Sequence, residues 1–350
     1  MRRLPVFFVL DCSESMVGDN LRKMEDGIKA IVRNLRTDPQ ALETVAISVI
    51  AFAGIARTIA PLVEVATFYT PKLPLGGGTS LGAALDTLMA EIDKSVVKTT
   101  VDQKGDWKPI VYLFTDGRPT DDPLPAISKW HSKYSSKATM IAVGLGADSD
   151  FKILKRVTEN VIIFEDSQVG DFDKFVRWVS ASVVVQSKSV GESVERLVFP
   201  DLDESVMKKF DESSRSLADE ACVTLVGRCQ KSHKPYIIKY DREKHNLRSL
   251  DFKLQVSNYV LSGCYPLEED YFSWTDMRAG EFKVNSEDLS GSPGCPHCGN
   301  FTAFAVCSCG KLMCINGPEH ATCPWCEQSV SFSPSTSDDE GGFDVGRGRG

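Results

Sequence analysis

Five continuous apolar runs in the first half of the chain limit most strongly what it can fold into. They cover residues 4–10, 44–52, 110–115, 139–144 and 161–164. Runs of this length, rich in valine and isoleucine, are typical of strands covered on both faces. Helical patterns separate them, in residues 21–35, 81–97, 124–134, 151–159 and 172–185. This alternation predicts an α/β fold with a doubly wound, mostly parallel, Rossmann-like sheet.

The pattern changes near residue 187. A charged stretch follows, with a helix expected in residues 206–215, and short strand-like pieces then predict a small β-rich region over about 218–290. The polar, glycine-rich end of the chain has little to bury and is predicted to be disordered. The predicted parts are a first domain in 1–187, a linker in 188–217, a β-rich, cysteine-containing domain in 218–332 and a tail in 333–350.

Composition limits the classes of partner and the compartment. A net charge of −8 and a pI near 5.3 argue against a nucleic-acid-binding surface over the whole protein. No apolar run reaches the ~18 residues that span a bilayer, and the one near the first residue is too short for a signal peptide. Seven of the 11 cysteines lie in residues 295–326, a clustering that favours metal binding over disulfides in a cytosolic protein. We expect a cytoplasmic protein without membrane or nucleic-acid partners.

Oxygen-bearing side chains stand at three points beside the predicted sheet. Asp11, Ser13 and Ser15 occur in "DCSES" directly after the first strand, Thr79 in "GGGTS" before a helix, and Asp116 in "TDG" after the third strand. Because ligands of such sheets bind at the carboxyl ends of the strands, these side chains are expected to converge. Hard cations such as Mg²⁺ take oxygen ligands of this kind. Each piece alone also fits an ordinary helix cap or turn.

Together the three pieces resemble the von Willebrand factor A family over about residues 1–186. "DCSES" is similar to the family's D-x-S-x-S motif, "GGGTSLG" supplies its threonine and "TDG" its second aspartate. The resemblance implies a metal ion-dependent adhesion site that binds Mg²⁺, Mn²⁺ or Ca²⁺, with a carboxylate of a partner protein completing the coordination. Its ligands here would be Asp11, Ser13, Ser15, Thr79 and Asp116. Cys12, within the motif, is expected to point into the core.

The cysteine-rich segment 295–326 offers eight zinc donors: Cys295, Cys298, Cys307, Cys309, Cys314, His320, Cys323 and Cys326. A C-x-x-C turn places two thiolates on one ion, so eight donors make two four-coordinate Zn²⁺ sites. The matching "CPHC" and "CPWC" turns favour a zinc-ribbon-like pairing, with Cys295, Cys298, Cys323 and Cys326 on one ion and the other four donors on the second.

An interleaved cross-brace, as in a RING finger, stays open as the other way to pair these donors. Cys222, Cys229 and Cys264 lack paired spacing and are predicted to be core thiols.

An A domain followed by "CPHCG", "CSCGKLMC" and "CPWC" resembles the TerY-type tellurite-resistance family. That resemblance implies a bacterial stress-response protein that acts with a Ser/Thr protein kinase and a metal-dependent protein phosphatase. A non-enzymatic interaction or scaffold protein is therefore the leading hypothesis. A metal-dependent hydrolase or phosphatase is the first alternative. His131 is the first domain's only histidine and lies far in sequence from the metal ligands. A RING-like ligase module is the second alternative.

Overall fold

A computed structural model describes most of the chain. The described residues are 2–116, 118–145, 151–164, 171–189, 200–201, 207–209, 222–242, 258–276, 282–316, 320–332 and 342–348. The chain divides into two compact units, Met1–Pro74 with Gly78–Ala218, and Leu75–Gly77 with Asp219–Gly350.

A seven-stranded sheet forms the centre of the first unit, in the order β3-β2-β1-β4-β5-β6-β7. Its strands are β1 (Leu4–Asp11), β2 (Val45–Phe52), β3 (Ala56–Glu64), β4 (Ile110–Thr115), β5 (Thr139–Leu145), β6 (Val161–Phe164) and β7 (Met207–Lys209). The five inner strands pair in parallel, and they are β2, β1, β4, β5 and β6. Only the edge strands β3 and β7 are antiparallel to their neighbours. The predicted α/β fold with a mostly parallel sheet is confirmed.

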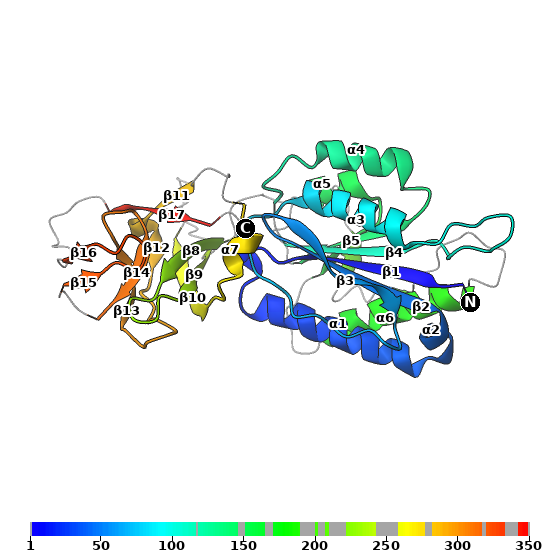
Figure 1. Cartoon of the computed structure of the whole chain (residues 1–350), viewed down its shortest axis with the longest axis horizontal. Coiled ribbons are helices and arrows are strands. Elements are labelled where there is room, and N and C mark those ends of the chain that lie inside the picture. The colour runs from blue at the N-terminus through cyan, green and yellow to red at the C-terminus, as the bar shows by residue number, and fades with distance from the viewer. Residues whose placement is uncertain are drawn as a thin grey trace, which may run out of the picture. The chain divides into compact units, whose positions relative to one another are not determined.

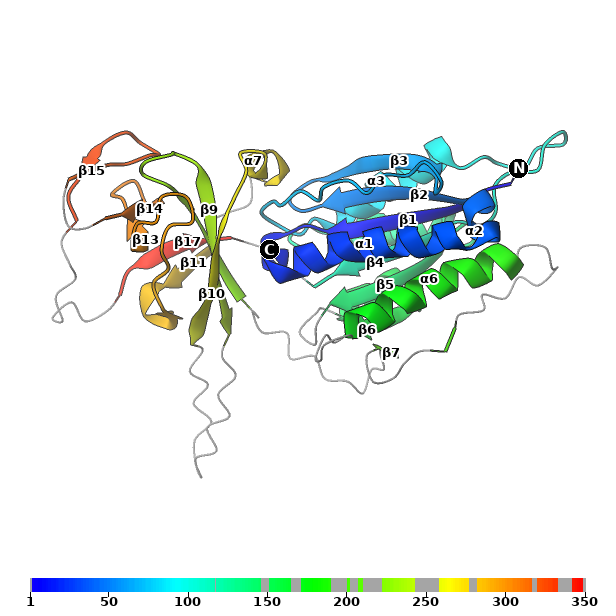
Figure 2. The same cartoon turned by 90° about the horizontal axis from the view of Figure 1, so that it is seen from below.

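Helices cover both faces of this sheet. They are α1 (Asp19–Thr37), α2 (Pro39–Thr44), α3 (Leu81–Ser95), α4 (Leu124–Lys133), α5 (Phe151–Val157) and α6 (Asp171–Ser189), and a short 3₁₀ turn, η1 (Glu14–Met16), follows β1. Helices α1 and α6 lie on one face, and α3, α4 and α5 lie on the other (Figures 1 and 2). On the α3–α5 side, apolar side chains such as Leu85, Leu113 and Trp130 form a buried cluster. Because both faces are covered, the inner strands need the continuous apolar sequence that predicted them.

The prediction omitted β3, β7 and α2. Strand β3 is half-buried or exposed at every position except Ala60 and contains Pro61, which an edge strand tolerates, so it lacks the continuous apolar signal. Helix α2 is a six-residue turn that the Asp38 carboxylate caps by accepting from the Ala41 N–H at 3.0 Å. The helix expected over 206–215 is wrong for residues 207–209, which form β7, and its other residues lie outside the described ones.

The second unit is built on a six-stranded sheet in the order β12-β10-β9-β8-β14-β13. The strands are β8 (Cys222–Arg228), β9 (Pro235–Arg242), β10 (Tyr259–Pro266), β12 (Leu289–Ser290), β13 (Thr302–Val306) and β14 (Leu312–Ile315). Strand β14 of the cysteine-rich segment pairs in parallel with β8 of the β-rich region, while β13 extends the sheet antiparallel to β14. The two predicted regions therefore share one sheet and one core, which includes Leu225, Tyr236 and Ile238.

Two smaller ladders complete the second unit, together with the helix α7 (Tyr271–Trp274) and the 3₁₀ turn η2 (Ser286–Asp288). One ladder joins β15 (Ala321–Thr322) to β16 (Ser329–Val330), and the other joins β11 (Phe282–Asn285) to β17 (Asp344–Arg347). The predicted disorder of the tail is wrong for Asp344–Arg347, because these residues pair with β11 and bury Val345. Residues 333–341, 349 and 350 of that tail lie outside the described part of the chain.

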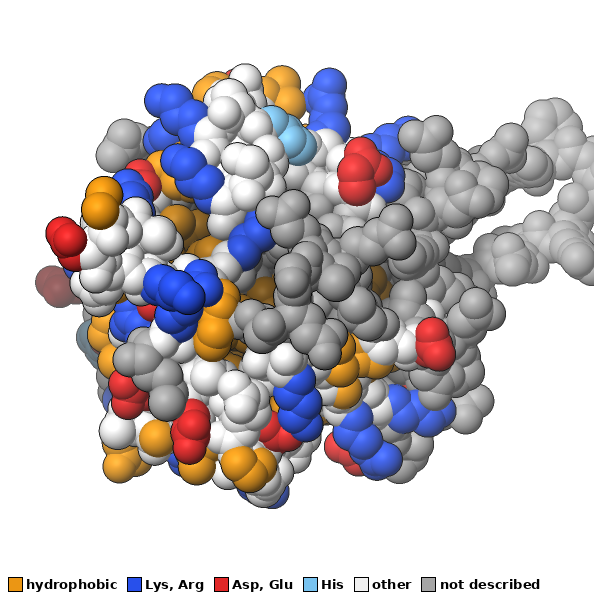
Figure 3. All heavy atoms as spheres, turned by 90° about the vertical axis from the view of Figure 1, so that its right-hand side faces the viewer, with side chains coloured by type: hydrophobic (Ala, Val, Ile, Leu, Met, Phe, Trp, Pro, Cys, Tyr) orange, Lys and Arg blue, Asp and Glu red, His pale blue; other side chains and the backbone are white. Residues whose placement is uncertain are grey.

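Two further features concern the surface charge and the length of the helices. On the face that Figure 3 shows, basic and acidic side chains of the described residues are interspersed. Among the described helices, none is both long enough and apolar enough to cross a membrane.

Candidate metal sites

The oxygen donors of the first unit begin at the carboxyl end of β1. Asp11 ends this strand and is fully buried, as is Ser13 two residues later. The Ser13 N–H donates to Asp11 Oδ1 at 2.9 Å, which turns the chain so that the two side chains share one side. Ser13 Oγ and Ser15 Oγ lie 3.0 Å apart and share a hydrogen bond.

Asp116 joins this group from the end of β4. Ser15 Oγ donates to Asp116 Oδ1 at 2.8 Å, and Thr115 Oγ1 donates to Asp11 Oδ2 at 2.5 Å. Strands β1 and β4 are parallel neighbours, and this pairing brings their carboxyl ends together. Asp11, Ser13, Ser15 and Asp116 therefore form one hydrogen-bonded chain at the edge of the sheet.

Electrostatics at this edge favour a cation. Burial and the negative charge of Asp116 together raise the pKa of Asp11 to about 7, against the hydrogen bonds that Ser13 and Thr115 donate. Two carboxylates in a poorly solvated site repel each other. A divalent cation would offset both this repulsion and the cost of burying the charge.

Thr79 reaches the same edge from the loop before α3. The N–H of the next residue, Ser80, donates to Ala53 O at 2.7 Å, directly after β2. Thr79 itself is 1 % exposed, and no described residue makes a hydrogen bond to its Oγ1. A buried hydroxyl without a partner costs about 1–3 kcal/mol, so such a group calls for an explanation. A cation held by Thr79 and the neighbouring oxygens would supply that explanation.

Cys12 lies inside this motif and takes no part in it. Its side chain is fully buried, and burial raises the pKa of its thiol well above the usual value. Its backbone N–H donates to Phe52 O at 2.7 Å, in continuation of the β1–β2 ladder. The thiol therefore belongs to the core, as the sequence predicts.

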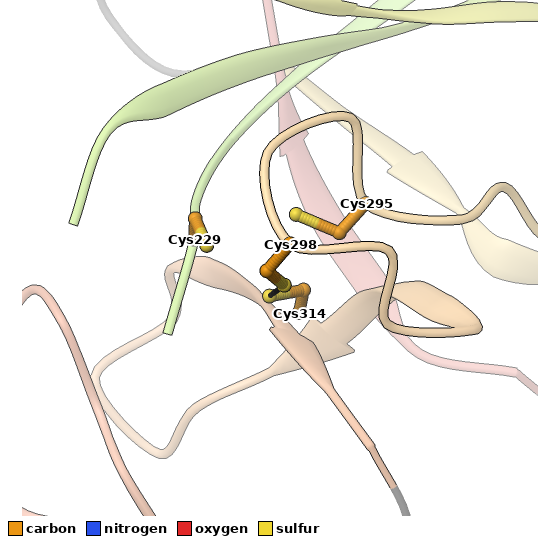
Figure 4. A group of neighbouring side chains, drawn as sticks. All are labelled: Cys229, Cys295, Cys298 and Cys314. Carbon is orange, nitrogen blue, oxygen red and sulfur yellow. Dashed lines mark hydrogen bonds between the residues drawn. The ribbon is translucent and has the colours of Figure 1, made fainter. Parts of the chain in front are cut away.

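The second unit brings eight thiols into two groups. One group is Cys229, Cys295, Cys298 and Cys314, and the other is Cys307, Cys309, Cys323 and Cys326. All four sulfur atoms of a group lie within 4.8 Å of one another, and all of these cysteines are free thiols. Figure 4 shows the four side chains of the first group pointing toward one another.

The sulfur spacing fits tetrahedral zinc. Zn–S bonds of about 2.3 Å at tetrahedral angles place the sulfurs roughly 3.8 Å apart. Cys298 and Cys314 lie 3.7 Å apart, Cys307 and Cys326 3.7 Å, and Cys309 and Cys323 3.9 Å, measured between Sγ atoms. A disulfide needs about 2.05 Å, so this spacing is that of metal ligands.

Four turns of the same type deliver seven of these thiols. In each turn a cysteine N–H donates to a carbonyl four or five residues on, from Cys229 to Lys234, Cys295 to Asn300, Cys307 to Lys311 and Cys323 to Gln328, at 2.8–2.9 Å. Each turn also contains a residue with positive φ: His233, Gly299, Gly310 and Glu327. We name these turns knuckles. Each metal group takes thiols from two of them.

The knuckle at Cys229 has Ser232 where the knuckles at Cys295 and Cys323 have their second cysteine. Cys314, in β14, supplies the missing thiol of that group. The parallel pairing of Met313 with Arg228 places Cys314 beside Cys229 at the end of β8. Tertiary pairing therefore completes a ligand set that one knuckle leaves incomplete.

Backbone N–H groups of the knuckles point at the sulfurs. Ser232 N donates to Cys229 Sγ at 3.4 Å, and Trp325 N donates to Cys323 Sγ at 3.4 Å. Burial raises the pKa of the Cys229 thiol, but hydrogen bonds from the Ser232 side chain and the knuckle backbone outweigh burial and lower that pKa to about 6. The thiolate form, which binds metal, is thus favoured at this position.

The grouping differs from the zinc-ribbon-like pairing that the sequence favours. Cys295 and Cys298 do not share a group with Cys323 and Cys326. From Cys295 on, the two groups alternate along the chain, as in the interleaved alternative. His320 lies outside both groups, where its Nδ1 is 2.7 Å from Ser331 Oγ.

Cys229 is the ligand candidate that sequence reasoning missed. It was predicted to be a core thiol because no second cysteine stands three residues later. The signal that could have revealed it is the segment "CQKSHK", which matches a knuckle with serine in the second position.

Comparison with known families agrees with this two-part arrangement. A family model for the von Willebrand factor type A domain matches residues 6–177, and one for the TerY-C metal binding domain matches residues 219–350. The chain joins a von Willebrand factor type A domain to a TerY-C domain. The architecture predicted from the sequence motifs is confirmed.

Solved structures resemble the von Willebrand factor type A domain. Proximal thread matrix protein 1 from the mussel byssus is 18% identical over 52% of this chain and 48% of its own, with a TM-score of 0.39. A von Willebrand factor type A protein from Catenulispora acidiphila is 20% identical over 52% and 43%, with a TM-score of 0.40. Another structure of the mussel protein, with a zinc-occupied adhesion-site motif, is 18% identical over 51% and 46%, with a TM-score of 0.35. The match covers less than half the length of each of these proteins.

Proposed function

We propose that the von Willebrand factor type A domain is a metal-dependent module for protein interaction. Asp11, Ser13, Ser15, Thr79 and Asp116 hold Mg²⁺ or Mn²⁺, with Ca²⁺ as a weaker fit, and an Asp or Glu of a partner protein completes the coordination. The observation that carries this proposal is the buried Thr79 hydroxyl, which has no partner among the described residues, together with a hydrogen-bonded chain of two carboxylates and two serines.

The donor set explains why a partner carboxylate would be attracted. Two carboxylates balance the charge of a divalent cation, and the three hydroxyls are neutral and weak ligands. A cation in such a site stays electrophilic toward a further anionic oxygen, and Mg²⁺ seeks six oxygen ligands. These residues would hold the cation, and the chemistry that it would supply is the capture of one carboxylate.

The TerY-C domain has a different role in this proposal. Each of its cysteine groups offers four thiols, which fill a tetrahedral Zn²⁺ and leave no open position. Two zinc ions would therefore hold the fold together and present a second protein-binding surface. The proposed scaffold joins two partners, one at the open metal site of the first domain and one on the surface of the TerY-C domain.

We place this scaffold in a bacterial tellurite-resistance circuit, together with a Ser/Thr protein kinase and a metal-dependent protein phosphatase. The support is the TerY-C match together with the resemblance of the motifs. Ser13 and Thr79 are 0 % and 1 % exposed. A kinase cannot reach these hydroxyls in the folded domain, so the proposal makes the kinase a binding partner of the adhesion site and not its modifier.

A metal-dependent phosphatase gains no support from the position of His131. This residue lies near the end of α4, and its Nε2 is 2.7 Å from Arg156 O near the end of α5. Helices that follow parallel strands run back along the sheet, so both ends lie at the edge opposite to the adhesion site. We therefore keep the interaction function as the proposal.

The decisive experiment is a pull-down from the native host with three forms of the full chain: wild type, Asp11→Ala and Thr79→Ala. Magnesium should be removed by dialysis, because EDTA would also strip zinc from the TerY-C domain. We expect partners to be captured by wild type with Mg²⁺, and lost without Mg²⁺ or with either variant.

Asp86→Ala is the matched control, since Asp86 lies on the surface of the same domain, paired with Lys129 at 2.7 Å. The control should behave as wild type. Equal capture by wild type and Asp11→Ala, with both folded, would refute the metal-dependent grip.

A further inference from the structure

Thr79 is held on both sides of its backbone by one residue from another loop. The Thr79 N–H donates to Thr120 Oγ1 at 2.9 Å, and the Thr120 N–H donates to Thr79 O at 2.9 Å. Thr120 belongs to the segment 118–122, which follows the metal aspartate Asp116. The fit is close, because a Cβ atom on Gly78, which has φ +99°, would lie 3.2 Å from Thr120 Oγ1.

Asp121 fixes the helix that begins next to Thr79. Its carboxylate accepts from the N–H groups of Gly82 and Ala83, at 3.2 and 3.1 Å. These groups lie in the first turn of α3, where Ser80 stands at the N-cap position without a side-chain hydrogen bond to the helix. Asp121 therefore caps α3 from another loop, and its charge favours the positive end of the helix dipole. A Cβ atom on Gly82 would lie 2.8 Å from Asp121 Oδ2, so this contact requires glycine there.

We propose that Thr120 and Asp121 are positioning residues of the metal site, which tie the Thr79 loop to the Asp116 loop. This inference rests on the proposed metal-binding function and deepens it. Four hydrogen bonds link two of the three ligand loops, and none of them comes from a ligand side chain. The spacing between Thr79 Oγ1 and the Asp116 carboxylate is thus set before a cation binds.

Loss of this link should lower metal affinity, because the threonine ligand would no longer be preorganised. Residues that hold metal ligands in place typically contribute about 10- to 100-fold to affinity. Thr120→Val keeps the shape but removes the acceptor for the Thr79 N–H, so we expect a loss in that range. Thr120→Ser keeps the hydroxyl and should bind nearly as wild type. Asp121→Ala should lose affinity through the released start of α3.

The test is Mn²⁺ titration of the zinc-loaded full chain, followed by electron paramagnetic resonance of free Mn²⁺, with the melting temperature measured without Mn²⁺. Thr158→Val is the matched control for Thr120→Val, because Thr158 Oγ1 accepts from Asn160 N at 3.2 Å far from the site. Asp38→Ala is the control for Asp121→Ala, because Asp38 caps α2. Both controls should lower the melting temperature and leave Mn²⁺ affinity unchanged.

The outcomes separate the two proposals. If wild type binds Mn²⁺ and Asp11→Ala does not, the metal site stands. Unchanged affinity in Thr120→Val then overturns the positioning role alone, as does a loss that Thr120→Ser fails to rescue. If wild type binds no Mn²⁺, or if Asp11→Ala binds it equally well, the proposed function fails and this inference falls with it.

Discussion

The candidate metal ligands of the two domains lie in different surroundings, and we expect them to affect stability in opposite directions. In the von Willebrand factor type A domain a large apolar core surrounds the sheet, and the Asp11 carboxylate is buried against its preference for water. In the TerY-C domain the cysteines themselves belong to the core, and one cluster consists mainly of Ala305, Cys307, Met313, Ala321 and Cys323. The first domain should thus fold without metal and bear a cost for its site, whereas the second should depend on metal for its fold.

The largest effect is expected from the second cysteine group. Replacing both Cys323 and Cys326 by serine removes two thiolates, and structural zinc contributes about 10–16 kcal/mol to folding in small zinc modules. We expect the full chain to lose one zinc and residues 302–330 to lose protection from hydrogen exchange. Cys264→Ser is the control, since Cys264 lies in neither group. Retained zinc and protection in the double variant would contradict this dependence on metal.

A smaller change tests how the first cysteine group is assembled. Cys314→Ser, like Cys229→Ser, should lower the zinc content by one ion, whereas His320→Ala should leave two ions bound. Because Ser232 occupies the second position of its knuckle, Ser232→Cys added to Cys314→Ser should restore part of the binding. Metal analysis by mass spectrometry under native conditions checks all four variants. Zinc loss in His320→Ala, without loss in Cys229→Ser, would show that His320 and not Cys229 is the ligand.

Asp11→Asn tests the expectation that the metal site lowers the stability of the first domain. This change removes a buried charge that Asp116 opposes, and it also removes a cation ligand. We expect Mn²⁺ binding to vanish while the metal-free domain melts a few degrees higher, since ~1 kcal/mol corresponds to about 2–4 °C for a domain of this size. Differential scanning calorimetry with and without Mg²⁺ measures both effects. A lower melting temperature without metal would show that the site does not cost stability.

The last effect concerns an ion pair that stabilises the first domain without metal. Burial raises the pKa of Asp106, but hydrogen bonds from Arg3 and the Val97 N–H outweigh it and hold that pKa below its usual value. The stabilisation is therefore present above about pH 4, the value in the unfolded chain, and is lost as the pH falls through the lower folded-state pKa.

Asp106→Asn should cost about 1–3 kcal/mol at pH 7, and its difference from wild type should shrink below about pH 4. Urea denaturation at several pH values measures this difference. A cost that is the same at pH 3 and pH 7 would contradict the assignment. Chelators should not change the stability difference between Asp106→Asn and wild type. The ion pair would then stabilise the first domain independently of metal, unlike the thiol groups of the TerY-C domain.

Local sequence patterns were enough to predict most of the central strands of the first domain. The inner strands β1, β2, β4, β5 and β6 follow from continuous apolar runs, because a strand covered on both faces has no other composition available. Edge strand β3 and the short β7 could not be found in this way, since an edge strand is half exposed and a three-residue strand has too few residues for a pattern. Strand β17 was hidden for a related reason: "DVGR" offers only Val345 to a core, and pairing with β11 is what buries it.

The sequence by itself determined which chemistry each domain can hold, because donor type and turn geometry are properties of a few adjacent residues. Asp11, Ser13 and Ser15 are oxygen donors in one turn, and the "CPHC" and "CPWC" segments are thiol-bearing knuckles wherever they lie. Only the tertiary structure decided which distant donors meet. The parallel register of β14 on β8 brings Cys314 to Cys229 and leaves His320 aside, since strand pairing depends on the packing of the whole sheet and not on the spacing of cysteines.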